Sequence, residues 1–221
     1  MNRMVQVMIV LLLAVVGLQW YVPRWIATQA ATQIMTLDHG ERPVITITAI
    51  PFWYLFSGGF QDVYVNAKNV PMGPLTIADT TVNWQNGAVG VTPLLKHRLV
   101  ITRPGHMAVI ITVDQVALAH FLAQEGKFQN PTVHIDPTGI SIGGRVLLGG
   151  VYVPLDTRGT LVVSSDKKSL IFHPTSIDGI QLPMVTDIEI FNVNSIKLPV
   201  ELEIQSVTLQ QGSMEVKAKT P

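Results

Sequence analysis

The sequence contains no cysteine, which excludes disulfide bonds, cysteine nucleophiles, iron–sulfur clusters and thiolate zinc sites. Charged residues are also scarce: they make up 14% of the 221 residues, against ~25% in a typical soluble domain, and the formal net charge is zero. Nucleic-acid binders normally carry a basic surface, so the charge balance disfavours that class. Hydrophobic residues account for 48% of the chain, which is too many for an intrinsically disordered protein.

Charge is missing altogether from one stretch near the N-terminus. No charged residue lies between Arg3 and Arg24, and a helix over this gap would be roughly 30 Å long, the thickness of a bilayer core. Trp20 and Tyr21 follow the most apolar part, where aromatic side chains lie at the membrane–water interface. We therefore expect residues 1–25 to form a signal anchor with a transmembrane helix, and residues 26–221 to form one extracytoplasmic domain.

Two alternatives to the anchor stay open. The segment Thr28-Gln29-Ala30 has the small-x-small pattern of a cleavage site, so residues 1–25 would then belong to a signal peptide and the protein would be secreted. A buried core helix is the other alternative. The two flanking arginines hardly determine orientation, but the free amino terminus favours an inside N-terminus. We expect a single-pass protein whose domain faces the outside of the cell membrane.

After Gly40 most of the chain has the two-residue period of β-strands. Residues 44–49 and 75–84 alternate in this way, and shorter segments repeat the pattern as far as residue 209. Turn sequences such as Asn86-Gly87 and Asp136-Pro137-Thr138-Gly139 separate the segments. A strand about every ten residues predicts an all-β or α+β fold.

Three segments have helical rather than strand character. Ile26–Leu37 has apolar residues one helical turn apart. Pro51–Phe56 begins with a residue suited to a helix start and is followed by Ser57-Gly58-Gly59, which predicts a stop. The third helix begins after Asp114, a plausible N-cap, and runs to about Gln124. Because this helix has almost no polar face, we expect it to be buried.

Two strand segments, Met107–Val113 and Val146–Leu155, are apolar on both faces. Too few helices are available to cover them, so the sheet must curl, pack on a second sheet or face an apolar ligand. Gly143-Gly144 and Gly149-Gly150 supply the bends that curvature needs. The sequence predicts an α+β, mostly β fold, with curved antiparallel sheets and one or two buried helices after the N-terminal transmembrane helix.

The candidates for catalysis are weak. Gly139-Ile140-Ser141-Ile142-Gly143 matches the G-x-S-x-G pattern, but that pattern requires a strand, a sharp turn and a helix, whereas Ser141 lies inside an alternating strand. A hydrolase acting through Ser141 is the least favoured alternative. The six histidines lack metal-ligand spacing, and the carboxylates are dispersed. We expect no catalytic residue, no cofactor and no metal site.

Two clusters have both a structural and a membrane interpretation. Lys96, Arg98 and Arg103 flank one short strand, and form either the solvated ends of a hairpin or a positive rim for anionic lipid headgroups. The aromatic segment Phe52-Trp53-Tyr54-Leu55-Phe56 forms either core packing or a lip that dips into the bilayer interface. We place the candidate headgroup site at the three basic residues.

The segment from Ile50 to Val70, with its Pro51-Phe52 turn and its Gly59-Phe60 step, resembles the opening of the LmeA-like phospholipid-binding family. Leu75–Val82 is similar to the next strand of that family, and Ile196–Val216 is similar to its closing strand and hairpin. The likeness covers about Thr36 to Lys219; the Trp53-Tyr54 pair departs from it, since aliphatic residues are commoner there. The resemblance implies a non-enzymatic envelope protein that binds phospholipid, acidic ones among them, and a link to envelope glycolipid assembly.

The apolar strands, the helix after Asp114 and the aromatic segment together define the expected acyl-chain groove, whose affinity would come from buried apolar area at ~25 cal/mol per Å². The candidate lipid-binding residues are Phe52, Trp53, Phe56, Val109, Ile111, Phe121, Leu122, Val146, Leu148, Val151 and Val153. The expected partners are phospholipid and the membrane, without nucleic acid, and the sequence does not identify a protein partner. A structural or adaptor module with a solid core is the alternative, because a lipid cavity and a self-filled core use the same residue types.

Overall fold

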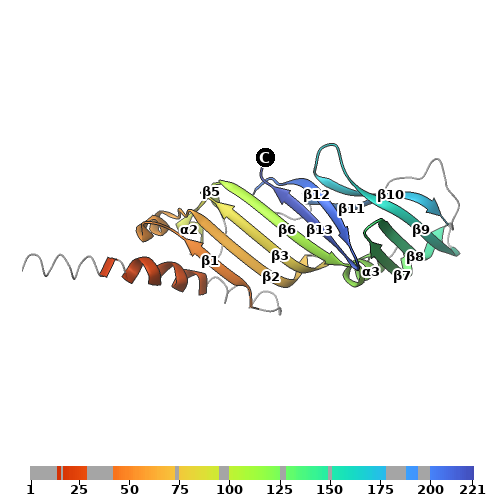
Figure 1. The fold of residues 1–221 in the computed structure, drawn as a ribbon, viewed down its shortest axis with the longest axis horizontal. Coiled ribbons are helices and arrows are strands. Elements are labelled where there is room, and N and C mark those ends of the chain that lie inside the picture. The colour runs from red at the N-terminus through yellow and green to blue at the C-terminus, as the bar shows by residue number, and fades with distance from the viewer. Residues whose placement is uncertain are drawn as a thin grey trace, which may run out of the picture. The chain divides into compact units, whose positions relative to one another are not determined.

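The computed structural model describes residues 14–15, 17–28, 42–72, 75–94, 100–124, 128–148, 151–177, 188–193 and 200–221 (Figure 1). Residues 17–28 are helical, and the other described helices are η1 (Phe52–Ser57, a 3-10 helix), α2 (Val91–Leu94) and α3 (Gln115–Gln124). The strands are β1 (Val44–Thr48), β2 (Asp62–Met72), β3 (Leu75–Gln85), β4 (Ala88–Val89), β5 (Ile101–Arg103), β6 (His106–Asp114), β7 (Phe128–Asp136), β8 (Gly139–Leu148), β9 (Val151–Val163), β10 (Ser169–Ile177), β11 (Ile188–Asn192), β12 (Glu203–Gln210) and β13 (Ser213–Lys219).

The strands form a six-stranded sheet in the order β1-β2-β3-β6-β13-β12, a five-stranded sheet in the order β11-β10-β9-β8-β7, and a small sheet of β4 and β5. The chain divides into two compact units: unit 1 holds residues 1–66 and 82–107, and unit 2 holds residues 67–81 and 108–221. The prediction of a mostly β fold with antiparallel, curled sheets is confirmed.

In unit 1, β1 pairs antiparallel with β2 from Val44 opposite Asn66 to Thr48 opposite Asp62. The core of this unit is small. The ring of Trp84 meets the ring of Phe60 edge-on, with 4.7 Å between ring centroids, and its indole N–H donates to the carbonyl oxygen of Pro104 at 2.5 Å. Both aromatic side chains are buried, so they fix the turn that follows β3.

In unit 2 the five-stranded sheet is a run of antiparallel neighbours, and β6, β13 and β12 also pair antiparallel. The pairing of β7 with β8 shifts between Gln129 and Thr132, opposite Gly144, which has φ 153°. This irregularity confirms the bend predicted at Gly143-Gly144, whereas Gly149-Gly150 lies outside the described residues. The largest fully buried side chains of the unit belong to Phe172, Ile77, Leu118, Ile135, Ile140, Leu170, Ile204 and Met214.

The helix predicted after Asp114 is present as α3, and its N-cap is confirmed. One carboxylate oxygen of Asp114 accepts the backbone N–H of Ala117 at 2.6 Å, which satisfies a donor that the first helical turn leaves free. The expected burial of the whole helix is wrong. Leu118 and Leu122 are buried, but the side chain of Val116 is 71% exposed, because only one side of this short helix packs against the unit.

The helix predicted at Pro51–Phe56 is present as η1, but it is not buried either. Its backbone ends at Gly58, whose φ of 81° is the left-handed conformation that glycine adopts without strain. No residue of η1 is buried. A single 3-10 segment lacks a second turn with which to bury an apolar face, and its aromatic rings pack mainly on one another instead.

The N-terminal segment contains a helix, but the expected transmembrane helix is not shown. Residues 1–13 lie outside the described part of the chain, and among the described residues no helix has the length and apolar character that a membrane crossing requires. Of the helix predicted over Ile26–Leu37, residues 26–28 are helical and 29–37 lie outside the described residues. The helix of residues 17–28 instead packs on β1.

Candidate lipid groove

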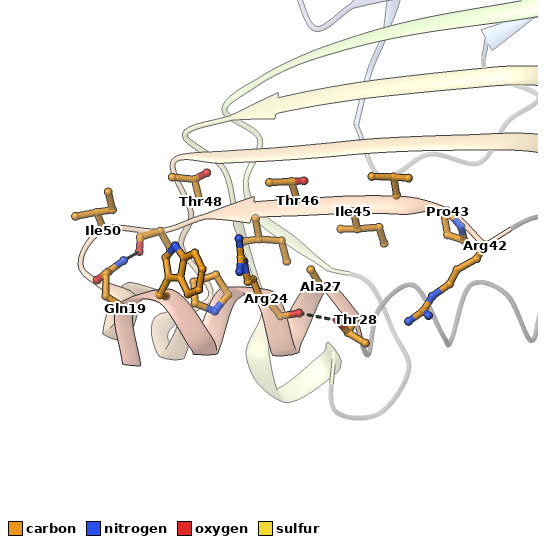
Figure 2. A pocket seen from close by; sticks show the side chains of 15 residues that line it. Gln19, Arg24, Ala27, Thr28, Arg42, Pro43, Ile45, Thr46, Thr48 and Ile50 are labelled. Atoms are coloured by element: carbon orange, nitrogen blue, oxygen red, sulfur yellow. Dashed lines mark hydrogen bonds between the residues drawn. The ribbon is translucent and has the colours of Figure 1, made fainter. Parts of the chain in front are cut away.

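A groove of about 780 Å³ lies in unit 1, between the helix of residues 17–28 and the segment of residues 42–50 that contains β1 (Figure 2). One wall is a helix face with Gln19, Pro23 and Ala27 spaced four residues apart. Pro23 and Ala27 are buried, so this face points toward the strand. The groove is formed by a helix laid along the edge strand of a sheet.

The side chain of Gln19 holds the helix in place. Its amide nitrogen donates to the carbonyl oxygen of Ala49 at 2.6 Å, and its amide oxygen accepts the backbone N–H of Phe52 at 2.7 Å. From the other side Gln61 makes a matching pair of bonds to the backbone N–H and carbonyl of Ile50, at 2.6 and 2.5 Å. The segment between β1 and η1 is therefore fixed by two glutamine amides, and the N-terminal end of the helix is fixed with it.

The floor of the groove is apolar because of the alternation of β1. Ile45 and Ile47 are half-buried, whereas Val44, Thr46 and Thr48 are exposed. Figure 2 shows the side chain of Ile45 between the strand and the helix, and the side chains of Thr46 and Thr48 on the opposite side of the strand. The same alternation that identified this strand in the sequence thus gives the groove a branched aliphatic floor.

Two arginines supply the charge of the groove. The guanidinium of Arg24 lies over the indole ring of Trp20, 3.7 Å from its centroid, in a cation–π contact. Arg42 lines the groove from the segment just before β1 (Figure 2). None of the described residues that line the groove is acidic. An aliphatic floor with cations and no carboxylate suits a ligand that carries both an alkyl chain and a negative charge.

Next to the groove, η1 brings several predicted site residues together. The ring of Phe52 meets those of Trp53 and Phe56 edge-on, at centroid distances of 5.5 and 6.0 Å. Arg103 donates a hydrogen bond to the hydroxyl of Tyr54 and lies 5.8 Å from the centroid of its ring. Arg103 is exposed, as expected for a headgroup contact, while Lys96 and Arg98 lie outside the described residues.

The other predicted lipid-binding residues lie in unit 2, and the structure leaves little space there. Val109, Ile111 and Leu122 are buried and Phe121 is half-buried. Ile111 and Phe121 line a cavity of only about 20 Å³, roughly the space of one water molecule, so no acyl chain fits beside them in this structure. Their contact with lipid stays a prediction.

The strands around residues 146–153 are only partly described. The backbone of β8 and β9 pairs here, with Val146 opposite Val153. The side chain of Val153 is exposed, whereas for Val146, Leu148 and Val151 the structure describes the backbone alone. An apolar run on both strand faces therefore does not mean that both faces are covered, since Val162 on β9 is also exposed.

Sequence reasoning missed the residues that form the groove: Gln19, Arg24, Ala27, Arg42, Ile45 and Ile47. The four-residue spacing of Gln19, Pro23 and Ala27 was the available signal, because it marks one helix face that carries small or polar side chains. The uncharged run before Arg24 led instead to a membrane interpretation for the whole segment. The contact between this helix and β1 depends on tertiary packing, which a local pattern does not contain.

Ser141 and the potential metal ligands are the other chemical candidates of the sequence, and their positions in the fold have structural explanations. Ser141 lies within β8, with His134 of β7 opposite it, and a strand continues on both sides where a nucleophile elbow would need a turn and a helix. No group of three or more potential metal ligands occurs among the described residues.

No curated protein and no solved structure matched the chain. A family model, that of LmeA-like phospholipid-binding proteins, matches residues 13–219, which is nearly the whole sequence. This match covers both walls of the groove, both units and all of the described sheets, and it agrees with the resemblance of residues 36–219 noted in the sequence. The chain is a member of the LmeA-like phospholipid-binding family.

Proposed function

We propose that the protein binds phospholipid in the groove between the helix of residues 17–28 and β1. An acyl chain lies along Ile45 and Ile47, and the phosphate faces Arg24 and Arg42. The groove volume of about 780 Å³ is the observation that carries this proposal, because it lies within the ~300–1,000 Å³ of ordinary ligand pockets. The cavity in unit 2 is about forty times smaller.

The energetics support an acyl chain as the main source of affinity. Each buried methylene contributes ~0.8 kcal/mol, so a chain that places ten methylenes on the apolar floor gains about 8 kcal/mol before the costs of ordering. The two guanidinium groups add a preference for an anionic headgroup over a neutral one. The ligand class that satisfies both features is a phospholipid or another amphiphile with a phosphate.

We also propose the cellular setting. The apolar start of residues 1–25, ahead of the groove-forming helix of residues 17–28, anchors the chain in a membrane. The rest lies on the extracytoplasmic side, and the protein holds or transfers lipid during cell-envelope assembly without catalysing a reaction. The uncharged run of residues 4–23 supports the anchor, and the family supports the lipid role. The strand position of Ser141 supports a role without catalysis.

The test compares a position in the groove with one outside it in the full-length chain. Ile45→Asp places a carboxylate on the apolar floor, whereas Thr208→Asp places the same group at an exposed position of β12 in unit 2. Binding of a fluorescent phospholipid to detergent-solubilised protein should fall at least tenfold in Ile45→Asp and stay near the unmodified value in Thr208→Asp. Native mass spectrometry of the unmodified chain should show co-purified phospholipid. Equal binding by both variants, or no binding by the unmodified chain, contradicts the proposal.

A further inference from the structure

The helix that forms the groove wall has a second, unpartnered face. Tyr21 and Trp25 project from the helix away from the buried Pro23 and Ala27, and they are 66% and 54% exposed. Trp20 is 69% exposed but lies beside Ala27 on the helix and lines the groove. Exposed tryptophan and tyrosine at this density are unusual on a soluble surface, because each large aromatic side chain gains free energy when it leaves water. This helix face is therefore suited to an environment that is partly apolar and partly hydrated.

A second group of exposed aromatic side chains belongs to the same unit. Trp53 and Phe56 on η1 are 54% and 65% exposed. The bonds of Gln19 tie η1 to the helix, since the backbone N–H of Phe52 donates to the Gln19 amide oxygen at 2.7 Å. We call Tyr21, Trp25, Trp53 and Phe56 the aromatic edge of unit 1.

Charge is distributed unevenly between the two units, although the whole chain is neutral. Unit 1 has six basic residues and three acidic ones, and unit 2 has the opposite imbalance. The charged residues of unit 1 are Arg3, Arg24, Arg42, Lys96, Arg98 and Arg103 on the basic side, and Asp38, Glu41 and Asp62 on the acidic side. Residues 82–107 and residues 42–61 contain no carboxylate at all.

The basic and aromatic groups are also combined locally. The guanidinium of Arg24 stacks on Trp20, and the guanidinium of Arg103 lies by the ring and hydroxyl of Tyr54. Aromatic rings partition to the headgroup level of a bilayer, and neighbouring cations attract anionic headgroups. This combination is typical of a surface that contacts a membrane. A protein partner would not require this combination, and neither would a neutral membrane.

From these observations we propose that the aromatic edge is a membrane-docking surface for bilayers that contain anionic phospholipid. It contacts the bilayer through Tyr21 and Trp25 of the helix and through Trp53 and Phe56 of η1, and the two η1 residues lie outside the proposed anchor of residues 1–25. This inference goes beyond ligand binding in the groove, because the edge would dock whether or not the groove is filled. Docking would place the groove at the membrane surface, from which a lipid could enter it.

The absence of cysteine allows a direct test in the full-length chain, because a single introduced cysteine is the only labelling site. Phe56→Cys and Thr208→Cys are each labelled with an environment-sensitive fluorophore and reconstituted into vesicles. Phe56 lies on the aromatic edge, and Thr208 is an exposed residue of β12 in unit 2. The vesicles contain phosphatidylcholine alone, or equal parts of phosphatidylcholine and phosphatidylglycerol.

In the anionic vesicles the label at position 56 should shift its emission to the blue and be quenched by lipids with brominated acyl chains. The label at 208 should do neither. The shift should weaken at high salt and in Arg103→Gln, but persist in Arg103→Lys. Ile45→Asp should leave the label at 56 unchanged, which separates failure of docking from failure of groove binding. An aqueous emission at 56 in both vesicle types overturns the inference, as does disulfide cross-linking of the unlabelled Phe56→Cys chains to each other together with no quenching of the labelled chain by lipid.

Discussion

The side-chain amide of Gln19 donates a hydrogen bond to the carbonyl oxygen of Ala49 at 2.6 Å, and this contact joins the helix to the residue that follows β1, 30 residues further along the chain. Through the same amide, Gln19 also accepts the backbone N–H of Phe52. One side chain thereby positions the helix of residues 17–28, β1 and η1, the three elements around the candidate groove.

Replacing Gln19 should loosen this arrangement. Gln19→Leu keeps a similar volume but removes two hydrogen bonds and leaves a carbonyl and an N–H without partners, at a cost of about 1–3 kcal/mol. We expect faster amide hydrogen exchange in residues 17–28 and 49–52 and weaker phospholipid binding. Gln205→Leu, at an exposed position of β12, is the control. Unchanged amide hydrogen exchange in Gln19→Leu would show that the two hydrogen bonds of Gln19 do not hold the helix.

Arg24 should determine headgroup preference. Its guanidinium faces the groove beside Trp20, so Arg24→Gln removes one of the two groove cations while leaving the aliphatic floor intact. We expect the Kd for a fluorescent phosphatidylglycerol to rise about fivefold, and the Kd for a diacylglycerol with the same chains to stay unchanged. Equilibrium fluorescence titration measures both. An equal loss for the charged and the uncharged ligand contradicts a headgroup role.

Gly58 should resist substitution more strongly than another glycine of the same unit. A Cβ at Gly58, with φ 81°, would strain the backbone and collide with the carbonyl oxygen of Val89. Gly58→Ala should lower the free energy of unfolding by roughly 1–3 kcal/mol and disturb η1. Gly17, in the N-terminal helix, has open space around its Cβ position. Gly17→Ala should therefore be neutral or stabilising in the same denaturation experiment.

Asp136 should make stability depend on pH at the turn between β7 and β8. Hydrogen bonds from the side chain and backbone of Thr138 hold the pKa of the Asp136 carboxyl below its ordinary value of 3.8, and Arg158, at 3.2 Å, acts in the same direction. Because folding lowers this pKa, the stabilisation is complete above pH 3.8 and is lost as the pH falls through the lower folded value.

Asp136→Asn should therefore lower the Tm at neutral pH, and the difference from the unmodified chain should shrink in strong acid. Thermal denaturation followed by circular dichroism at a series of pH values measures this. A control is Asp79→Asn on β3, a carboxyl outside this turn. A Tm difference between Asp136→Asn and the unmodified chain that stays constant across the acid range would contradict the assigned pKa shift.

Features with local causes could be predicted from the sequence. The strand alternation at residues 44–49, the N-cap at Asp114, the stop at Gly58 and the turn at Asp136 each depend on neighbouring residues, and the structure has all four. The family resemblance was also correct. Burial was harder to predict: the helix after Asp114 has almost no polar face and residues 146–155 are apolar on both strand faces, yet the side chains of Val116 and Val153 are exposed.

The position of the groove could not be predicted. Hydrophobic periodicity identifies which residues prefer to leave water, but it does not distinguish a self-filled core from a ligand site. In unit 2 the apolar side chains of Ile111, Leu118 and Phe121 meet one another and leave space for about one water molecule. In unit 1 the helix face of Gln19, Pro23 and Ala27 is too small to fill the space above β1, and a groove results.

The most direct test of the account is to find where a bound phospholipid's acyl chain lies. Full-length protein loaded with a phospholipid that carries a photoreactive diazirine in its acyl chain is irradiated, and the cross-linked peptides are identified by mass spectrometry. The account predicts cross-links in residues 19–28 and 42–50. Cross-links concentrated instead at β6 and α3, around Ile111 and Phe121, would place the lipid in unit 2 and contradict it.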